Sequence, residues 1–174
     1  MLGGVILFLI IAGLFTQSGN GQNNIFTPYL PFFKLGAGKP TATPASNNGN
    51  LKTITVGKTS LDVVVASNDE LRSKGLGGVT NLPENQGMLF VFSTKNINPS
   101  FWMKDMLIPI DFIWIRNNRV SEINPDARPP VNGTPDNQLQ IYKPVNPIDY
   151  VLEVNAGFAA RHTIMVGDNV VLNL

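Results

Sequence analysis

From Leu51 onward the sequence consists of short β-branched runs separated by turn residues, and few folds can accommodate that pattern. The runs Thr53–Val56 and Leu61–Ala66 flank the pair Gly57-Lys58, which predicts a β-hairpin. A second hairpin is predicted around Asn117-Asn118, because asparagine tolerates the left-handed backbone that a two-residue turn requires. We therefore expect strands to outnumber helices in this region.

The other predicted elements are also short. Further strands are expected at Met88–Phe92, Ser100–Lys104, Ile110–Ile115, Arg119–Ile123, Tyr150–Val154 and Val170–Leu172. One short helix should follow a capping box at Ser67–Glu70 and end at Gly75, which suits a left-handed helix end. A second short helix should run from a cap at Asn155 to Arg161.

Six prolines lie between Asn124 and Pro147, and this density predicts a long surface loop because proline has no amide hydrogen to donate. Taken together, the elements predict a mainly β (α+β) domain over residues 51–174. The expected form is a small, compact, partly closed β-barrel or a sandwich with two short helices.

The N-terminal segment Met1–Phe15 is apolar and carries no charged side chain. As a helix, about 15 residues would rise roughly 22 Å, against roughly 30 Å for the hydrocarbon core of a bilayer. Residues 1–16 are therefore interpreted first as a signal anchor and second as a cleaved signal peptide, with a buried core helix as the remaining alternative.

Residues 17–50 are rich in Gly, Asn and Pro and are predicted to form a flexible linker. The sequence thus predicts a domain outside the cytoplasm that is anchored to the membrane through residues 1–16 or is secreted.

Composition excludes several kinds of site. The net charge is +1, and no basic stripe marks a nucleic-acid surface. The chain has no cysteine, which rules out disulfides and thiolate metal sites. His162 is the only histidine, and no metal-ligand spacing surrounds it. No metal or cofactor is therefore predicted.

Asp111 is the first candidate functional residue, because it lies within the apolar run Ile110–Ile115. A carboxylate there is costly to bury without a partner, and Lys104 or Arg72 could supply the donor. A structural pair between Lys104 and Asp111 is favoured over a functional polar site. Arg72 could hold an anionic ligand, or cap a carbonyl and cover apolar surface.

Trp102 and Glu153 complete the candidate set. Trp102 is either a platform on which a ligand stacks or a core aromatic, and the core role is favoured. Glu153 shares a strand face with Asp149 and Val151, and a solvated face is the simpler interpretation.

Several motifs occur in a fixed order along the chain. They are Arg72-Ser73-Lys74-Gly75-Leu76, Leu82-Pro83-Glu84-Asn85-Gln86-Gly87-Met88-Leu89-Phe90-Val91-Phe92, Phe101-Trp102-Met103-Lys104, Ile108-Pro109-Ile110-Asp111, Val151-Leu152-Glu153-Val154-Asn155-Ala156-Gly157 and Gly167-Asp168. With them, most of residues 51–174 resembles the bacterial and archaeal family called domain of unknown function 192. The resemblance implies a compact, β-rich single domain and no established activity. Gly75-Leu76-Gly77 departs from the Gly-Leu-Met of many members.

Two functions remain open at this level. The first is a membrane-tethered binding or accessory module of the cell envelope for a small-molecule, polymer or protein ligand. Its binding face would comprise Arg72, Trp102, Lys104, Asp111 and Glu153. The alternative is a small hydrolase or lyase that acts on envelope polymers, with Asp111 and Glu153 as acid and base. The binding role is favoured because no other catalytic constellation stands out.

Overall fold

The computed structural model describes residues 51–174, so the predicted membrane segment (residues 1–16) and linker (residues 17–50) lie outside the described residues. The strands are β1 (Leu51–Val56), β2 (Thr59–Ala66), β3 (Gln86–Val91), β4 (Phe101–Trp102), β5 (Ile110–Arg116), β6 (Arg119–Ala127), β7 (Ile141–Tyr142), β8 (Tyr150–Asn155) and β9 (Val170–Leu172). The helices are α1 (Asp69–Lys74), α2 (Phe158–Arg161) and the 3-10 turn η1 (Asp136–Gln138). Within the described part of the chain, no helix has the length and apolar character that crossing a membrane requires.

Both predicted hairpins are present. β1 and β2 pair antiparallel around Gly57, whose φ of +60° is a conformation that favours glycine. β5 and β6 pair around Asn117 and Asn118, whose φ values are +50° and +55°. Two consecutive residues with positive φ form the turn whose twist matches that of the flanking strands.

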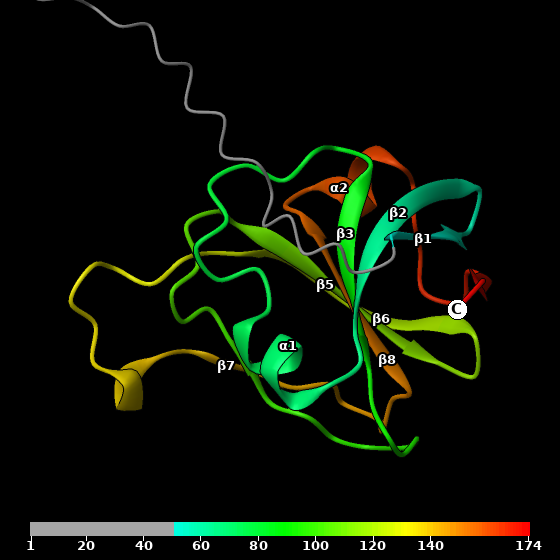
Figure 1. The fold of residues 1–174 in the computed structure, drawn as a ribbon. Coiled ribbons are helices and arrows are strands. Elements are labelled where there is room, and N and C mark those ends of the chain that lie inside the picture. The colour runs from blue at the N-terminus through cyan, green and yellow to red at the C-terminus, as the bar shows by residue number, and fades with distance from the viewer. Residues whose placement is uncertain (1–50) are drawn as a thin grey trace, which may run out of the picture. The chain divides into compact units, whose positions relative to one another are not determined.

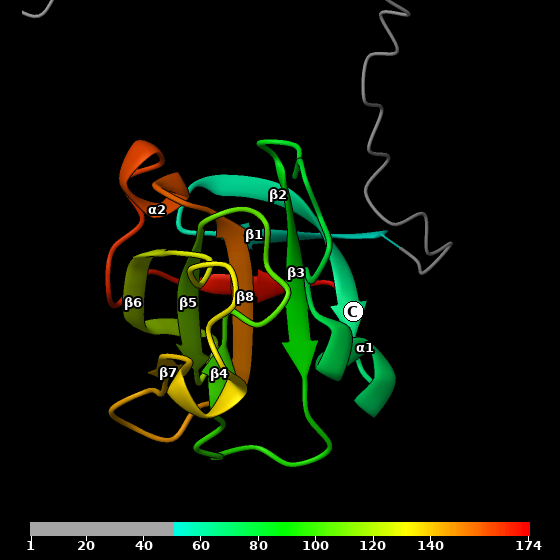
Figure 2. The same cartoon turned by 90° about the vertical axis from the view of Figure 1, so that its left-hand side faces the viewer.

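Seven strands form one sheet in the order β6-β5-β8-β3-β2-β1-β9, and β4 pairs with β7 in a separate two-stranded ribbon. β2 and β3 are parallel and are joined through α1, whereas the other neighbours in the large sheet are antiparallel. The sheet curls far enough for Asn169, just before β9, to form a bridge with Arg119 at the start of β6. Figures 1 and 2 show this curled half-barrel, and the prediction of a mainly β, partly closed fold with two short helices is confirmed.

The concave face of the sheet encloses one apolar core. β5 and β8 supply alternate residues to it, such as Ile113 and Leu152, which are fully buried. Phe158 of α2 also packs into this core, so the second helix covers one end of the half-barrel. This core therefore holds the curled sheet together from inside.

The opposite face of the sheet carries a second core. Trp114 and Phe112 of β5 are buried there, together with Phe90 of β3. α1 covers part of this face, and the β4–β7 ribbon covers another part (Figure 2). Because α1 and the β4–β7 ribbon are both short, they cover this face as separate pieces. The candidate site lies where these pieces meet.

Several local predictions differ from the structure. The strand expected at Ser100–Lys104 has only two residues in β4. Within the proline-rich segment, β6 extends to Ala127 and two further short elements, η1 and β7, interrupt the loop. Asn68, not Ser67, caps α1, because its side chain accepts a hydrogen bond from the amide of Leu71.

Asp111 is a structural anchor rather than one half of an ion pair. Its side chain is 1 % exposed and accepts hydrogen bonds from the amides of Asp126 at 3.0 Å, Gly157 at 2.9 Å and Ala159 at 3.0 Å. Gly157 is the N-cap residue of α2 and Ala159 lies in its first turn, so Asp111 performs the capping role that was predicted for Asn155. The expected Lys104–Asp111 pair is wrong, because backbone amides satisfy the carboxylate.

We expect Asp111→Ala to lower the free energy of unfolding by about 3 kcal/mol, because three amides lose their acceptor in a buried place. Urea denaturation measures the change. Glu70→Gln, at an exposed position of α1, is the control and should stay within about 0.5 kcal/mol of wild type. A loss for Asp111→Ala as small as that of the control would contradict the anchoring role.

Candidate binding cavity

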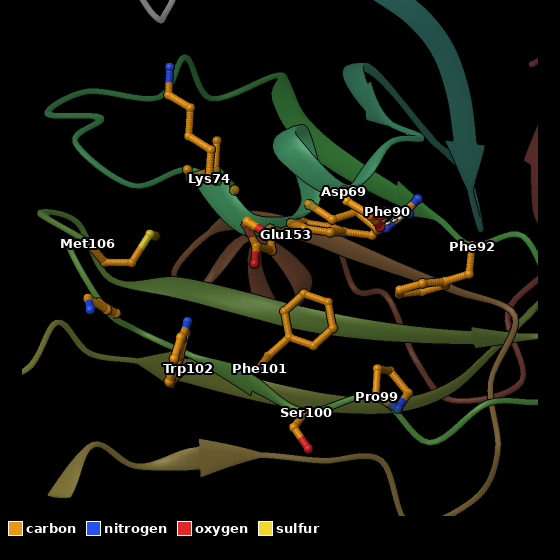
Figure 3. A pocket seen from close by; sticks show the side chains of 15 residues that line it. Asp69, Lys74, Phe90, Phe92, Pro99, Ser100, Phe101, Trp102, Met106 and Glu153 are labelled. Atoms are coloured by element: carbon orange, nitrogen blue, oxygen red, sulfur yellow. Dashed lines mark hydrogen bonds and ion pairs between the residues drawn. The ribbon is translucent and has the colours of Figure 1, made fainter. Parts of the chain in front are cut away.

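A cavity of about 350 Å³ lies between α1, the end of β3 and the segment that contains β4. Figure 3 shows the side chains that line it. The lining residues are Asp69, Arg72, Ser73, Lys74, Gly75, Leu76, Phe90, Phe92, Pro99, Ser100, Phe101, Trp102, Lys104, Met106 and Glu153. Apolar and aromatic walls with a few polar groups are typical of small-molecule sites.

Glu153 of β8 lies at the base of this cavity. In the strand register it is opposite Met88 of β3 and Phe112 of β5, so it shares the outer face of the sheet with them. The side chain is buried, with 4 % exposure, and Oε2 has no hydrogen-bond partner within the described residues 51–174. Figure 3 shows the carboxyl directed into the cavity, toward the wall that carries Phe101.

Burial raises the pKa of the Glu153 carboxyl from its ordinary 4.5 to about 8. Desolvation is the cause, because it disfavours the charged form. At neutral pH the side chain is therefore mainly a neutral carboxylic acid, which has one hydrogen to donate and one carbonyl oxygen to accept with. The solvated strand face predicted for Glu153 is wrong.

Gly75 at the end of α1 lies beside this buried carboxyl. Its φ of +51° ends the helix, as predicted from the sequence. A Cβ added to Gly75 would lie 3.8 Å from Oε2 of Glu153 and 3.5 Å from Cζ of Phe90. The glycine thus ends the helix and keeps that space beside the carboxyl free of a side chain.

Trp102 lies at the rim of the cavity with 48 % exposure, so the core position predicted for it is wrong. Its neighbour Phe101 turns inward, and its ring makes edge contacts with Phe90 and Trp114 at centroid distances of 4.9 Å and 5.7 Å. Alternation along β4 explains the division, because successive side chains point to opposite faces.

Lys104 also lies at the rim, where its Nζ is 5.8 Å from the centre of the Trp102 ring. The ammonium forms an ion pair of 2.5 Å with Asp136 in η1, and this hydrogen bond raises the pKa of Lys104. The Lys104 partner is therefore a residue of the long loop, and the pair joins that loop to the cavity wall.

Arg72 of α1 caps a carbonyl and covers apolar surface, which was one of the two roles considered for it. It donates to the carbonyl oxygen of Val91 at 2.8 Å and forms an ion pair of 2.5 Å with Asp69. Its guanidinium also lies 5.9 Å from the centre of the Phe92 ring. This arrangement holds α1 against the end of β3 and forms one side of the cavity.

The proposed acid–base pair of Asp111 and Glu153 does not form. In the register of β5 and β8, Asp111 is opposite Val154 and Glu153 is opposite Phe112, so the two carboxyls lie on opposite faces of the sheet. They cannot act together on one substrate. Asp149 is likewise buried, not solvated, and accepts from the amides of Asn96 and Asn117.

Four of the five candidate residues predicted from the sequence, Arg72, Trp102, Lys104 and Glu153, line the same cavity. Sequence reasoning missed Phe90, Phe101 and Met106, because apolar residues that line a cavity have the same pattern as core residues. Among residues 51–174 no group of three His, Asp or Glu side chains is arranged to hold a metal ion.

Comparisons with known proteins support the resemblance. The family profile of domain of unknown function 192, described as "Uncharacterized ACR", matches residues 52–172. A solved structure from Sinorhizobium meliloti, described as a "putative transcription regulator", is 26% identical with a TM-score of 0.62, covering 70% of this chain and 92% of that chain. A protein of unknown function from Novosphingobium aromaticivorans is 27% identical with a TM-score of 0.64, covering 72% of this chain and 88% of that chain. The comparison with curated proteins found no match.

The raised pKa of Glu153 predicts a distinctive pH dependence of stability. Between the ordinary pKa of 4.5 and the folded value of about 8, the folded state binds more protons than the unfolded state. The stabilising contribution is therefore complete below the lower value and is lost as the pH rises toward the upper one, by up to about 1.4 kcal/mol per pH unit.

Urea denaturation of wild type and Glu153→Gln, at about pH 5, 6, 7 and 8, measures this contribution. The difference in unfolding free energy between the two proteins should shift steadily in favour of the variant as the pH rises, because glutamine does not titrate. A difference that stays constant with pH would show that the carboxyl is not held neutral by burial.

Proposed function

The chain belongs to the domain of unknown function 192 family, and we propose that it is a binding module of the cell envelope that takes a small ligand in the cavity beside Glu153. The family supplies no activity, so the proposal depends on the geometry of the site. Residues 1–16 would tether the domain to the membrane, and residues 17–50 would give it reach, as their composition suggests.

The observation that carries the proposal is the buried carboxyl of Glu153 at the base of the cavity, whose Oε2 has no hydrogen-bond partner among residues 51–174. Leaving such a group unsatisfied costs on the order of 1–3 kcal/mol, and an apolar side chain at this position would avoid that cost. Unsatisfied polar groups with shifted pKa values are concentrated at functional sites. A ligand that bonds to the carboxyl would remove the penalty.

Trp102 supports a binding role independently. A tryptophan that exposes 48 % of its surface at the mouth of a cavity offers a broad apolar contact for a ligand. Because the ring contributes little to the core, its replacement should affect binding and leave folding intact. Replacement of Trp114, which is fully buried, should instead disrupt folding.

The test is ligand-detected NMR on the full chain with a panel of small heterocycles, sugars, amines and carboxylic acids. A compound that binds wild type should lose about tenfold in affinity with Trp102→Ala, since tryptophan is prominent among residues that dominate binding energy. The unfolding free energy should change by no more than about 0.5 kcal/mol.

Val145→Ala is the matched control, because Val145 is 82 % exposed and is not among the residues that line the cavity. It should leave both affinity and stability unchanged. If no compound of the panel binds wild type, or if Trp102→Ala unfolds the protein, the binding function is wrong.

The tether has its own test. Expressed in a bacterial host, the full chain should sediment with membranes and resist extraction by alkaline carbonate, because its first fifteen residues are apolar and uncharged. A variant that lacks residues 2–16 should be recovered in the soluble fraction. External protease should digest the domain in spheroplasts if it lies outside the cytoplasm. Recovery of the full chain in the soluble fraction, uncleaved, would contradict the tether.

A further inference from the structure

Three loops of the described domain meet at one corner of the half-barrel. They are the β1–β2 turn, the β5–β6 turn and the segment between α2 and β9. The amide of Gly57 donates to the carbonyl oxygen of Asn169 at 2.8 Å. The amide of Val170 donates to the carbonyl oxygen of Asn118, also at 2.8 Å. Both hairpin turns and β9 lie on the right-hand side of Figure 1. We call residues 57–58, 116–119 and 165–169 the basic corner, and none of them lines the cavity beside Glu153.

Two large apolar side chains project from the basic corner. Met165 and Val166 are 65 % and 66 % exposed, and they are the only consecutive pair of exposed large apolar residues within residues 51–174. Ile164 before them and Val170 after them are buried in the core. The exposed pair therefore lies at the apex of a loop whose two ends are fixed.

Hydrogen bonds also hold the loop itself in one conformation. The amide of Asp168 donates to the carbonyl oxygen of Met165 at 3.1 Å, and Oδ2 of Asp168 accepts from the amide of Met165 at 2.8 Å. The amide of Gly167 donates to the carbonyl oxygen of Val120 at 2.7 Å. Because the loop is already ordered, burial of its apex in a binding partner would cost little further chain entropy.

Cations lie beside the apolar apex. Arg119 donates from Nη1 to the carbonyl oxygen of Gly167 at 2.9 Å, and its other guanidinium N–H groups remain for a ligand. Lys58 is exposed and forms no ion pair with any of residues 51–174. With Arg116, the basic corner carries three basic residues and one acidic residue, Asp168. Apolar side chains beside cations match a bilayer with anionic lipids, because the apolar groups enter the acyl boundary and the cations stay at the phosphates.

A second adjacent pair of exposed apolar residues fits such a surface less well. Trp102 and Ile141 are opposite each other in the β4–β7 ribbon and are 48 % and 47 % exposed. Lys104 beside Trp102 is already paired with Asp136, so its charge is balanced. The combination of an apolar apex with unbalanced positive charge belongs to the basic corner.

We propose that the basic corner is a contact surface for an anionic lipid bilayer, into whose headgroup region Met165 and Val166 insert while the neighbouring cations bind lipid phosphates. The inference rests on the membrane location in the proposed function and adds the face by which the domain meets the bilayer.

The experiment uses the absence of cysteine, because a single introduced cysteine then carries an environment-sensitive dye at one position. Full chains with Val166→Cys, Ile141→Cys or Val145→Cys are labelled with nitrobenzoxadiazole and mixed with vesicles. The vesicles contain phosphatidylcholine alone or phosphatidylcholine with phosphatidylglycerol. With phosphatidylglycerol, the dye at position 166 should shift its emission to the blue and lose most of its quenching by aqueous iodide. The dyes at positions 141 and 145 should remain open to iodide in both kinds of vesicle.

The charge is tested separately on the chain with the dye at position 166. Lys58→Gln should lower the ratio of shielded to exposed dye about fivefold, since one cation near an anionic surface contributes about that factor. Lys143→Gln is the matched control, because Lys143 is exposed and lies outside the basic corner, and it should leave the ratio unchanged. Salt at about 1 M should weaken the shielding of the wild-type corner, because it screens the charges.

The other outcomes separate this inference from the tether. If the chain is anchored but the dye at position 166 stays open to iodide, or the dye at position 141 is shielded instead, the lipid contact is overturned and the tether stands. Equal shielding in both kinds of vesicle overturns the choice of anionic lipid. Shielding without vesicles that grows with protein concentration assigns the corner to a second copy and overturns the lipid contact.

A chain that is not anchored, yet whose dye at position 166 is shielded by anionic vesicles, retains the lipid contact and loses the tether. Neither anchoring nor shielding overturns both. Circular dichroism checks that each labelled chain is folded, and Met165→Cys replaces Val166→Cys if the latter is not.

Discussion

The position of β8 between two partner strands decides where the chemistry of the domain can lie. β8 is paired with β5 on one side and with β3 on the other, so its side chains have only the two faces of the sheet to occupy. A shift of one residue would exchange the faces of all of them. In the observed register Glu153 points outward and Asp111 of the neighbouring strand points inward. One carboxyl therefore lines a cavity and the other supports the core.

The contrast between the buried acidic residues shows that Glu153 is set apart by its surroundings and not by burial alone. Asp111 receives three backbone amides and Asp149 receives two, so both are satisfied where they lie. Glu153 is also buried, but its Oε2 has no partner in the part of the chain that the structure describes. A position that sacrifices stability in this way is typical of a site that selection keeps for function.

The sequence predicted the local elements well and the distant pairings poorly. The turns at Gly57 and Asn117-Asn118 could be predicted because a hairpin is determined by a few neighbouring residues. The placement of Asp111 and Glu153 on opposite faces of the sheet could not be predicted, because it depends on the register of strands about forty residues apart. The partner of Lys104 was missed for a similar reason, since Asp136 lies in a proline-rich segment with no periodic pattern. Trp102 and Trp114 occur in similar apolar strings, and only the surrounding layers make one exposed and the other buried.

The cavity exists because the outer face of the sheet is covered by elements too short to close over it. α1 has six residues and β4 has two, so neither can extend across the width of the sheet. Each piece is fixed separately: Arg72 joins α1 to the end of β3, and the Lys104–Asp136 ion pair joins the β4 segment to the long loop. The gap between them lies above Glu153, and Gly75 keeps a side chain out of it. The two sides of the cavity are thus held by polar contacts that are partly exposed, above the seven-stranded sheet.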